Sequence, residues 1–401
     1  MSARLQVPRA LLWPILLIVF IDVLGFAVVI PLLPFYAQHL GATPATVGMV
    51  IGSYGLFALV AGPLLGRASD RFGRKPVLVI AQIGSTLGFV LMALAPNLAW
   101  LFVARMVDGI TAGNMATARA YLSDITPAPQ RAAAFGLISA AFGFGMIVGP
   151  AGAATLAPIS LRLPLWIAAG LSLTSLLCTL LLLPRGKVGN ARAPADLPAR
   201  SAIAAPQDVP VRAQLWRLFA FLASFSLFTS GFAMFAERRL LWNGHGFGAF
   251  EVGAALAYVG ALGLLTQLLI IGRLVHRFGE VRLTAWALPM TLLGYALLGA
   301  TFTLPMLALS LTLIALGNSL LRPCLLSLLS RSVPPQRQGI TFGISQSLQS
   351  LAMLMSPLIA GGLIQIGWLS AWAATSVAFL VVALSLQRHT LLRARVNQDF
   401  P

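Results

Sequence analysis

A short segment rich in glycine and arginine occurs twice in this chain, each time between two long apolar runs. The first copy spans residues 66–75 and reads GRASDRFGRK, and the second spans residues 272–279 and reads GRLVHRFG. The copies stand 206 residues apart in a chain of 401 residues, as expected when two similar halves arise by duplication. Parallel repeats of apolar segments are typical of membrane transporters, which predicts that the chain moves a small solute across a membrane.

Composition supports a membrane setting independently of the repeat. Hydrophobic residues make up 58% of the chain and charged residues only 9%, and the mean hydropathy is +0.89. Soluble domains carry roughly 25% charged residues, so lipid must be the solvent for most of this surface. Hydrocarbon offers no hydrogen bonds to the backbone, which leaves helices or a closed barrel. The apolar runs are about 20 residues long and do not alternate, which predicts an all-α membrane protein.

The apolar runs predict twelve transmembrane helices, six in each of two pseudo-symmetric halves. Their approximate ranges are 11–37, 45–65, 76–95, 98–124, 132–157, 163–184, 214–236, 249–272, 281–302, 305–329, 339–363 and 368–387. The expected domains are an N-terminal bundle at 1–184, a cytoplasmic linker at 185–213 and a C-terminal bundle at 214–401.

The net charge of +17 is explained by membrane topology rather than by nucleic-acid binding. Most of the 27 Lys and Arg residues fall in the termini and in the even-numbered connections, whereas only Arg162, Arg238 and Arg239 fall in the others. Positive residues gather on the cytoplasmic side, so both termini are expected there. No nucleic-acid partner is expected.

Nothing in the sequence indicates an enzyme or a cofactor. The phosphate-binding pattern Gly-x-x-x-x-Gly-Lys-Ser/Thr is absent, which excludes ATP hydrolysis of that type. Cys178 and Cys324 lie in separate spans without metal-ligand spacing, so no metal site is expected. No nucleophile–base pair stands out. The energy source is expected to be an ion gradient, which the ionisable residues within the spans make a proton gradient, unless the solute runs downhill.

Three ionisable residues inside the predicted spans are the candidates for proton coupling. Asp22 lies in the middle of the first span, and Arg105 and Asp108 are three residues apart in the fourth, on one helical face. A charge inside the membrane is costly unless it faces a partner or a cavity. Asp22 can form a structural ion pair with Arg105, or it can bind and release a proton. Arg105 and Asp108 can also neutralise one another on their own helix. The functional interpretation is favoured, with all three residues in one polar cluster.

The first Gly-Arg segment is expected to act as a latch at the cytoplasmic side rather than as a substrate site. Asp124, at the end of the fourth span, can pair with Arg74 or Arg71. The expected gate residues are Gly66, Asp70, Arg71, Gly73, Arg74 and Asp124. The second copy has His276 where the first has Asp70, which predicts a latch in only one half.

Other residues are assigned to packing or to a substrate cavity. Small residues in the fifth span are spaced for close helix contact, with a proline kink, at Gly145, Gly149, Pro150 and Gly152. Polar and aromatic side chains within the spans could line a cavity: Tyr36, Tyr54, Asn114, Gln267, Asn318, Arg322, Gln346 and Gln349. For Arg322, binding an anionic solute group and reaching toward the headgroups are equally good interpretations.

Several of these motifs resemble those of the major facilitator superfamily, and the likeness covers most of the chain outside the linker. Motif A of that superfamily is similar to Gly66-x-x-x-Asp70-Arg71-x-Gly73-Arg74-Lys75, and its helix 4 motif is similar to Arg105-x-x-Asp108-Gly109 with Gly113. The helix 5 antiporter motif resembles Gly145-x-x-x-Gly149-Pro150-x-Gly152. The helix 1 motif of twelve-helix drug/proton antiporters resembles Asp22 with Pro31. The branch that it most resembles is the tetracycline resistance efflux group.

The resemblance implies alternating access, proton-driven efflux and a central cavity, with Asp22 binding a proton or substrate and Arg105 modulating its protonation. The chain also departs from the tetracycline group. That group has an acidic residue in helix 3 where this chain has Gly88, another in helix 9 where this chain is apolar, and a neutral residue where this chain has Asp108. A broader drug or metabolite exporter is therefore expected.

The resulting prediction is a multi-pass protein of the bacterial inner membrane that exchanges a small amphiphilic compound for protons. Its expected partners are a small-molecule substrate, protons and the lipid bilayer, and a monomer suffices. Two alternatives stay open. One is a proton symporter that imports a sugar, an organic acid or a siderophore. The other is a non-transporting membrane receptor on the same fold.

Overall fold

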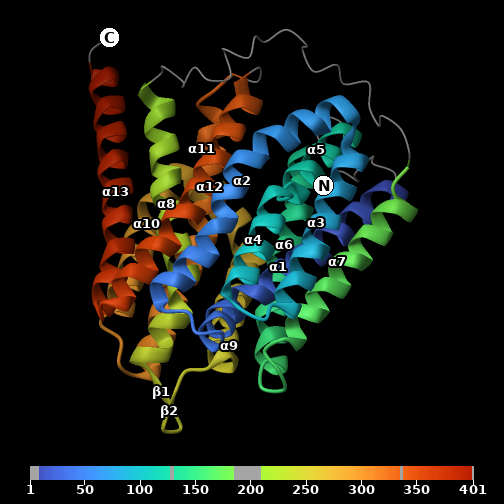
Figure 1. Cartoon of the computed structure of the whole chain (residues 1–401). Coiled ribbons are helices and arrows are strands. Elements are labelled where there is room, and N and C mark those ends of the chain that lie inside the picture. Colours follow the sequence, from blue (N-terminus) through green and yellow to red (C-terminus); the bar gives the residue numbers. More distant parts are fainter. Residues whose placement is uncertain (1–8, 127–130, 185–208, 335–336, 400–401) are drawn as a thin grey trace. The chain divides into compact units, whose positions relative to one another are not determined.

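The computed structural model is almost entirely helical and describes residues 9–126, 131–184, 209–334 and 337–399 (Figure 1). The predicted linker at 185–213 lies mostly outside these residues. The N-terminal elements are α1 (Arg9–His39), α2 (Pro44–Phe72), α3 (Arg74–Leu94), α4 (Leu98–Ile110), α5 (Asn114–Ile125), α6 (Arg131–Leu156) and α7 (Leu163–Leu182). They are followed by α8 (Val209–Arg239), β1 (Leu241–Trp242), β2 (His245–Gly246), α9 (Ala249–Leu265), the π-helical turn η2 (Thr266–Ile270), α10 (Ile271–Gly299), α11 (Leu304–Arg331), α12 (Gln338–Gln365) and α13 (Leu369–Asp399).

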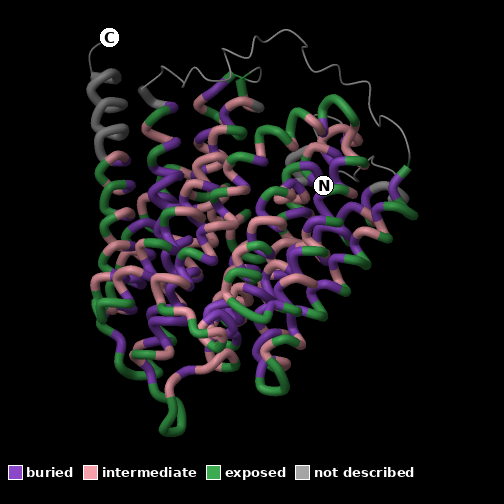
Figure 2. Tube along the Cα trace, viewed as in Figure 1, coloured by how far each residue is buried: buried purple, intermediate pink, exposed green. Residues whose placement is uncertain are grey.

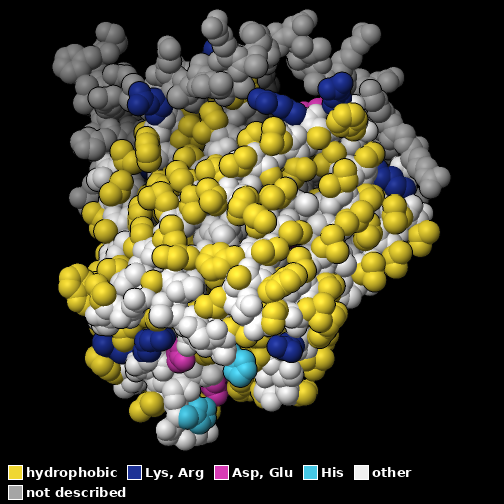
Figure 3. Space-filling view, in the orientation of Figure 1, with side chains coloured by type: hydrophobic (Ala, Val, Ile, Leu, Met, Phe, Trp, Pro, Cys, Tyr) yellow, Lys and Arg dark blue, Asp and Glu magenta, His cyan; other side chains and the backbone are white. Residues whose placement is uncertain are grey.

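Within the described residues, ten helical stretches are long and apolar enough to cross a membrane. Exposed hydrophobic side chains cover the lengths of the helices, and Lys and Arg side chains lie near helix ends (Figure 3). Leu181, Trp13 and Val60 are all more than half exposed, as expected for side chains whose solvent is lipid.

Three predicted spans differ from the observed helices. The span at 98–124 is broken at residues 111–113 into α4 and α5. Thr111 there donates its hydroxyl to the carbonyls of Val107 and Asp108, at 2.8 and 3.3 Å, which competes with backbone hydrogen bonding. Conversely, residues 249–299 form one stretch of 51 residues, interrupted by non-helical backbone at Gly279.

The duplication seen in the sequence is present in the backbone. Gly73 has φ 99° and ψ 162°, and Gly279 has φ 75° and ψ 159°. Only glycine adopts such angles without strain, so each copy of the Gly-Arg segment turns the chain sharply at the same position. The repeat therefore encodes a corner between two helices in each half.

Contacts divide the chain into two compact units, which are described separately. The first comprises Met1–Ala193 and Phe247–Ala261, and the second comprises Pro194–Gly246 and Leu262–Pro401. The sequence places residues 247–261 in the C-terminal half, whereas their contacts group them with the N-terminal unit. The reason is close packing on α6: a Cβ at Gly253 or at Gly260 would lie 2.7 Å from the carbonyl oxygen of Pro150 or Met146.

In the N-terminal unit, α6 also packs closely on α1. A Cβ at Gly145 would lie 2.7 Å from a methyl of Val23, and one at Gly149 would lie 2.5 Å from the Cβ of Ala27. Pro150 follows inside the helix, but Gly152 has nothing within 4 Å of where its Cβ would stand. Gly145 and Gly149 thus lie where helices approach, and Gly152 does not.

In the C-terminal unit, α8 is buried along most of its length (Figure 2). Side chains from neighbouring helices bond to its backbone: Trp372 Nε1 donates to the Leu227 carbonyl at 3.1 Å, and Ser356 donates to that of Ala223 at 3.0 Å. A Cβ at Gly231 would lie 2.2 Å from Trp372 Nε1. Small residues and hydroxyls therefore hold this bundle together, as is usual where apolar burial is not the driving force.

We expect Gly149→Ala to destabilise the protein by about 1–3 kcal/mol, because the added methyl group forces α1 and α6 apart. The matched control is Gly152→Ala, which meets open space and should be neutral or stabilise by up to about 1 kcal/mol through helix propensity. Thermal unfolding of both variants in detergent measures the difference. Equal melting temperatures would show that the α1–α6 approach is not tight.

Candidate functional site

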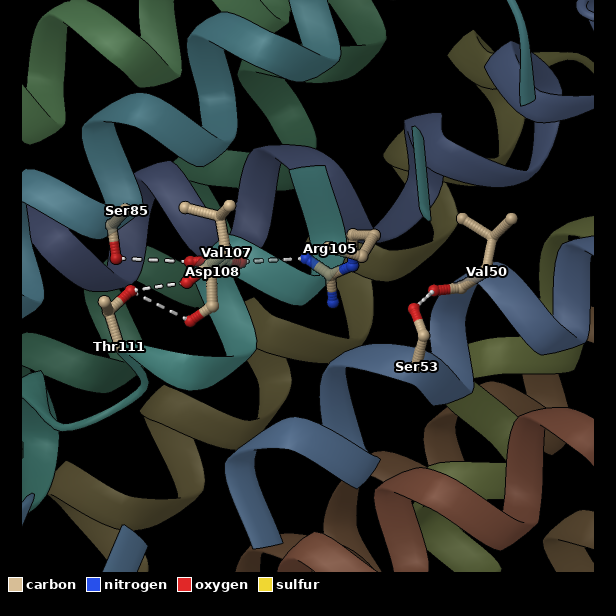
Figure 4. Close-up of polar contacts among 7 residues, drawn as sticks. All are labelled: Val50, Ser53, Ser85, Arg105, Val107, Asp108 and Thr111. Atoms are coloured by element: carbon tan, nitrogen blue, oxygen red, sulfur yellow. Dashed lines mark hydrogen bonds and ion pairs between the residues drawn. The ribbon is translucent and has the colours of Figure 1, made fainter. Parts of the chain in front are cut away.

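The most buried ion pair among the described residues joins Arg105 and Asp108 on α4. An Arg105 guanidinium nitrogen lies 2.9 Å from Asp108 Oδ2, and the two side chains are only 5% and 7% exposed. Ser85 on α3 donates its hydroxyl to Asp108 Oδ1 at 3.2 Å (Figure 4). Both carboxylate oxygens are thus occupied, so this position holds its charge in a low-dielectric interior by internal pairing.

Arg105 also connects α4 to α2. Its guanidinium carbon lies 4.5 Å from the centroid of the Tyr54 ring, within cation–π distance. The Tyr54 ring in turn lies 6.2 Å from that of Phe26 on α1. Arg105 Nε is buried without a hydrogen-bond partner among the described residues. The guanidinium therefore has unused donor capacity beside an aromatic ring.

Glycines that were not assigned from the sequence bring these helices together. A Cβ at Gly88 on α3 would lie 2.9 Å from the Cβ of Asp108, and one at Gly84 would overlap Thr111 at 2.1 Å. On α4, a Cβ at Gly109 would lie 2.8 Å from the carbonyl oxygen of Tyr54. Larger residues at these positions would separate α2, α3 and α4 and open the site. Only the unusual number of glycines in apolar runs signals this in the sequence.

Asp22 lies in a second polar group, between α1, α3 and α7. The Ser175 hydroxyl and the Gln82 amide interact with its carboxylate, and its Oδ1 is buried without a hydrogen-bond partner in the described chain. Gln82 Nε2 also donates to Ser175 Oγ at 2.7 Å. Gln82 and Ser175 were not predicted as site residues.

The structure therefore does not pair Asp22 with Arg105, which is one of the alternatives raised by the sequence. The ion-pair partner of Arg105 is Asp108. Helix α3 carries a partner of each carboxylate: Gln82 contacts Asp22, and Ser85, three residues later, donates to Asp108. Asp22 and Asp108 belong to one unit but to two separate groups of contacts.

The predicted loop latch is built around Arg74. Its Nε lies 2.8 Å from Asp124 Oδ2, one terminal nitrogen donates to Ser69 at 3.1 Å, and it also pairs with Asp70. Of the two predicted partners for Asp124, the structure selects Arg74. Arg71 instead lies over the ring of Phe72, and a Cβ at Gly66 would meet nothing within 4 Å.

The predicted cavity residues have different environments. Tyr36 is 1% exposed and donates its hydroxyl to the Ala95 carbonyl at 3.2 Å, so it ties α1 to the end of α3 instead of lining a cavity. Tyr54 contacts Arg105. Asn114 begins α5, and its Oδ1 is buried without a hydrogen-bond partner in the part of the chain that the structure describes.

In the C-terminal unit, Asn318 donates to the Tyr295 hydroxyl at 3.4 Å, and its Oδ1 is buried without a partner among the described residues. Gln267 lies in η2, a π-helical turn of the kind often found at functional sites. Gln346 is exposed, and Gln349 and Arg322 are partly buried.

Arg217 on α8 is a buried cation inside the predicted span at 214–236 that was not assigned as a site residue from the sequence. It is 3% exposed, and its guanidinium donates to the side-chain oxygens of Gln214 and Gln387, both at 3.0 Å. Its position inside the apolar run LWRLFAF was the available signal. The two amides satisfy part of a charge that has no ion pair in the described chain.

Comparison with known proteins identifies the family. The sequence pattern of the Major Facilitator Superfamily matches residues 15–270 and 240–397. The chain belongs to the major facilitator superfamily. It is a multi-pass membrane transporter, and the members it matches are transporters rather than enzymes.

Its relatives include proteins named for drug resistance. The chain is 32% identical to the class C tetracycline resistance protein of Escherichia coli, over 93% of this chain and 96% of that protein. It is 28% identical to multidrug resistance protein 1 of Bacillus subtilis (strain 168), over 86% and 88% of the two chains. The human organic anion transporter MFSD10 (TETRAN) has the same fold, with a TM-score of 0.73 at 23% identity over 94% of this chain and 99% of that one.

The geometry of the loop latch predicts unequal effects of its two carboxylates on stability. Asp124→Asn should cost about 1–2 kcal/mol, because Asp124 and Arg74 are 20% and 24% exposed and lose a direct ion pair. Asp70→Asn, the matched control, should cost no more than about 0.5 kcal/mol, since Asp70 is 61% exposed. Thermal unfolding in detergent compares the two. A larger loss for Asp70→Asn would contradict this assignment.

Proposed function

We propose that this protein is a proton-coupled antiporter of the bacterial inner membrane, which exports a small amphiphilic drug or metabolite by alternating access. The observation that carries the proposal is two carboxylates in the apolar interior of one unit: Asp108, which is buried, and Asp22, whose Oδ1 is buried. Ionisable groups in such places usually serve transport. The relatives named for tetracycline and multidrug resistance support export of a drug-like compound.

The proposed topology has twelve transmembrane helices with both termini in the cytoplasm. Helices α4 and α5 together make one crossing, and the corner at Gly279 divides residues 249–299 into two. Added to the remaining candidate spans, these give an even number, in agreement with the positive residues at the predicted cytoplasmic connections. The protein acts as a monomer, without a cofactor, and draws its energy from the proton gradient.

In the proposed mechanism, a proton binds a carboxylate oxygen and changes which polar contacts are favourable. Protonated Asp108 is neutral, so its ion pair with Arg105 is lost and the guanidinium becomes free to find another partner. Protonated Asp22 gains a donor that its carboxylate lacks, and the Gln82 Oε1 atom is a buried acceptor without a partner among the described residues. Each change alters contacts between helices of the N-terminal unit, and alternating access requires such a change.

Asp108 also offers an account of the departure from the tetracycline group. Its Cβ lies 2.9 Å from the place where a Cβ at Gly88 would stand. The acidic residue that the resemblance implies for helix 3 would begin at that point. We propose that α4 supplies from the opposite side the carboxylate that α3 lacks. A changed position of the charge suits a substrate other than tetracycline itself.

Polar residues within the spans of each unit are proposed to contact the substrate. In the N-terminal unit these are Tyr54 and Asn114, and in the C-terminal unit they are Gln267, Asn318, Arg322, Gln346 and Gln349. Tyr36 is left out because its hydroxyl is used within the fold. The buried, unpaired Oδ1 atoms of Asn114 and Asn318 are acceptors that a donor on the substrate could satisfy.

The test of proton coupling uses purified protein in liposomes that enclose a pH-sensitive dye. Cationic drugs and tetracyclines are added outside, and a substrate-evoked pH change is expected for the native protein. Asp22→Asn should abolish that change, because an amide cannot carry the proton. Glu237→Gln is the matched control, since this acid pairs with its neighbour Arg238 at a helix end and should leave the signal intact.

Intact coupling in Asp22→Asn would contradict the role of this carboxylate. Substrate uptake by energised cells would favour the proton symporter instead. Binding of compounds without any proton flux in the native protein would favour the non-transporting receptor.

Asp108→Asn should slow efflux by at least about tenfold, because it removes both a candidate proton site and the counter-ion of a buried arginine. Ser85→Ala removes only one hydrogen bond to the same carboxylate. It should raise the activation free energy of efflux by about 1 kcal/mol or less. Initial rates of efflux, normalised to folded protein, compare the two variants. Similar rates would show that the charge of Asp108 is dispensable.

A further inference from the structure

The second Gly-Arg segment ends in an ion pair that the sequence did not predict. Glu280 follows the corner at Gly279, and its Oε1 lies 2.9 Å from a guanidinium nitrogen of Arg331 at the end of α11. Ser327 also donates its hydroxyl to this oxygen, at 3.1 Å. The Glu280 side chain is only 12% exposed, whereas Arg331 is 70% exposed. The buried member of this pair is therefore the acid.

This pair occupies the same place in the repeat as the first latch, with the charges exchanged. Glu280 stands 206 residues after Arg74, and Arg331 stands 206 residues after Ile125, the neighbour of Asp124. In the first copy, a cation after the corner holds an anion near the end of α5. In the second copy, an anion after the corner holds a cation at the end of α11. Both pairs tie a helix that starts at the corner to the end of the next membrane crossing.

We propose that Glu280 and Arg331 form a second latch, of inverted charge, so that each unit carries its own. The expectation of a latch in only one half is thereby corrected: it followed from His276, which lies before the corner, whereas the pairing residue comes after it. The role of the second latch in closing a transport pathway rests on the proposed function. Its existence as a constraint on α11 does not.

The two partners differ in what their removal leaves behind. Without Arg331, the Glu280 carboxylate stays buried, with Ser327 as its remaining partner, which is unfavourable. Without the acid, Arg331 is already largely in solvent. Arg331→Gln should therefore separate α11 from α10, although removing an exposed arginine usually has little effect, because it leaves the buried carboxylate without its ion-pair partner.

A native cysteine reports on this latch. Cys324 lies on α11 three residues before Ser327, is 1% exposed, and is close enough to Glu280 for the two to interact electrostatically. The other cysteine, Cys178, lies on α7 and can be replaced by Ala. In that background, the rate at which N-ethylmaleimide alkylates Cys324 in liposomes measures how often the end of α11 separates from α10.

Arg331→Gln is expected to speed alkylation roughly tenfold, as a loosened two-state contact should. It keeps the Glu280 charge, so the change cannot come from a more reactive thiol. Arg331→Lys should restore the slow rate. The exchange Glu280→Arg with Arg331→Glu is assessed by efflux instead, because a cation beside Cys324 would itself make the thiol more reactive. Arg282→Gln, at an exposed arginine two residues beyond Glu280, is the control and should match the native protein.

Native alkylation rates in Arg331→Gln would overturn the proposal, and so would equally fast rates in Arg331→Lys and Arg331→Gln. A latch that serves transport should also lower the maximal efflux rate in Arg331→Gln with little change in KM, and the charge exchange should recover it. If the alkylation pattern holds but no compound evokes proton flux, the latch stands and the proposed function fails. If proton flux occurs but alkylation is unchanged in Arg331→Gln, the proposed function stands and the second latch fails.

Discussion

A hydrocarbon solvent offers no hydrogen bond to the peptide backbone, and the rest of this structure follows from that constraint. Backbone groups must be satisfied within helices, and helices gain little apolar burial from one another when lipid is equally apolar. They are held instead by close approach and by a few polar contacts. Gly145 and Gly149 let α6 approach α1, and hydroxyl and indole donors reach the backbone of α8. Where helix hydrogen bonding is interrupted, at residues 111–113 and at Gly279, the break lies next to a candidate functional group.

The same constraint makes each buried charge informative. Arg105 and Asp108 neutralise one another in an interior where either alone would be unfavourable, and Gly88 on α3 provides the space beside Asp108. Asp22 is different, because amide and hydroxyl groups surround it and it has no cation partner among the described residues. The N-terminal unit thus holds one carboxylate in an ion pair and one in a neutral polar setting. A transporter that couples a proton to movement can use two such environments for different steps.

Duplication preserved the backbone and allowed the chemistry to diverge. Gly73 and Gly279 have nearly the same conformation, since only glycine can form this corner, whereas the residues after them carry opposite charges. An ion pair depends on the product of its charges, so exchanging both signs leaves the attraction unchanged. The polar interiors diverged further: the C-terminal unit pairs Tyr295 with Asn318 and buries Arg217 between two amides, whereas the interior of the N-terminal unit holds Asp22 and Asp108.

The sequence by itself determined the membrane setting, the helical class, the twofold repeat and the residues that most deserve mutation, because hydropathy, charge asymmetry and spacing are local properties of the chain. It also indicated Asp124 as a partner of the loop, although the choice of Arg74 over Arg71 needed the structure. Only the tertiary structure decided which partners buried groups have: Asp108 rather than Asp22 for Arg105, the Ala95 carbonyl for Tyr36, and Arg331 for Glu280. The pairings of Tyr36 and Glu280 depend on the approach of segments far apart in sequence, which spacing along the chain does not specify. Arg105 and Asp108 share one helical face by their spacing, and the structure decided only that Arg105 pairs there rather than with Asp22.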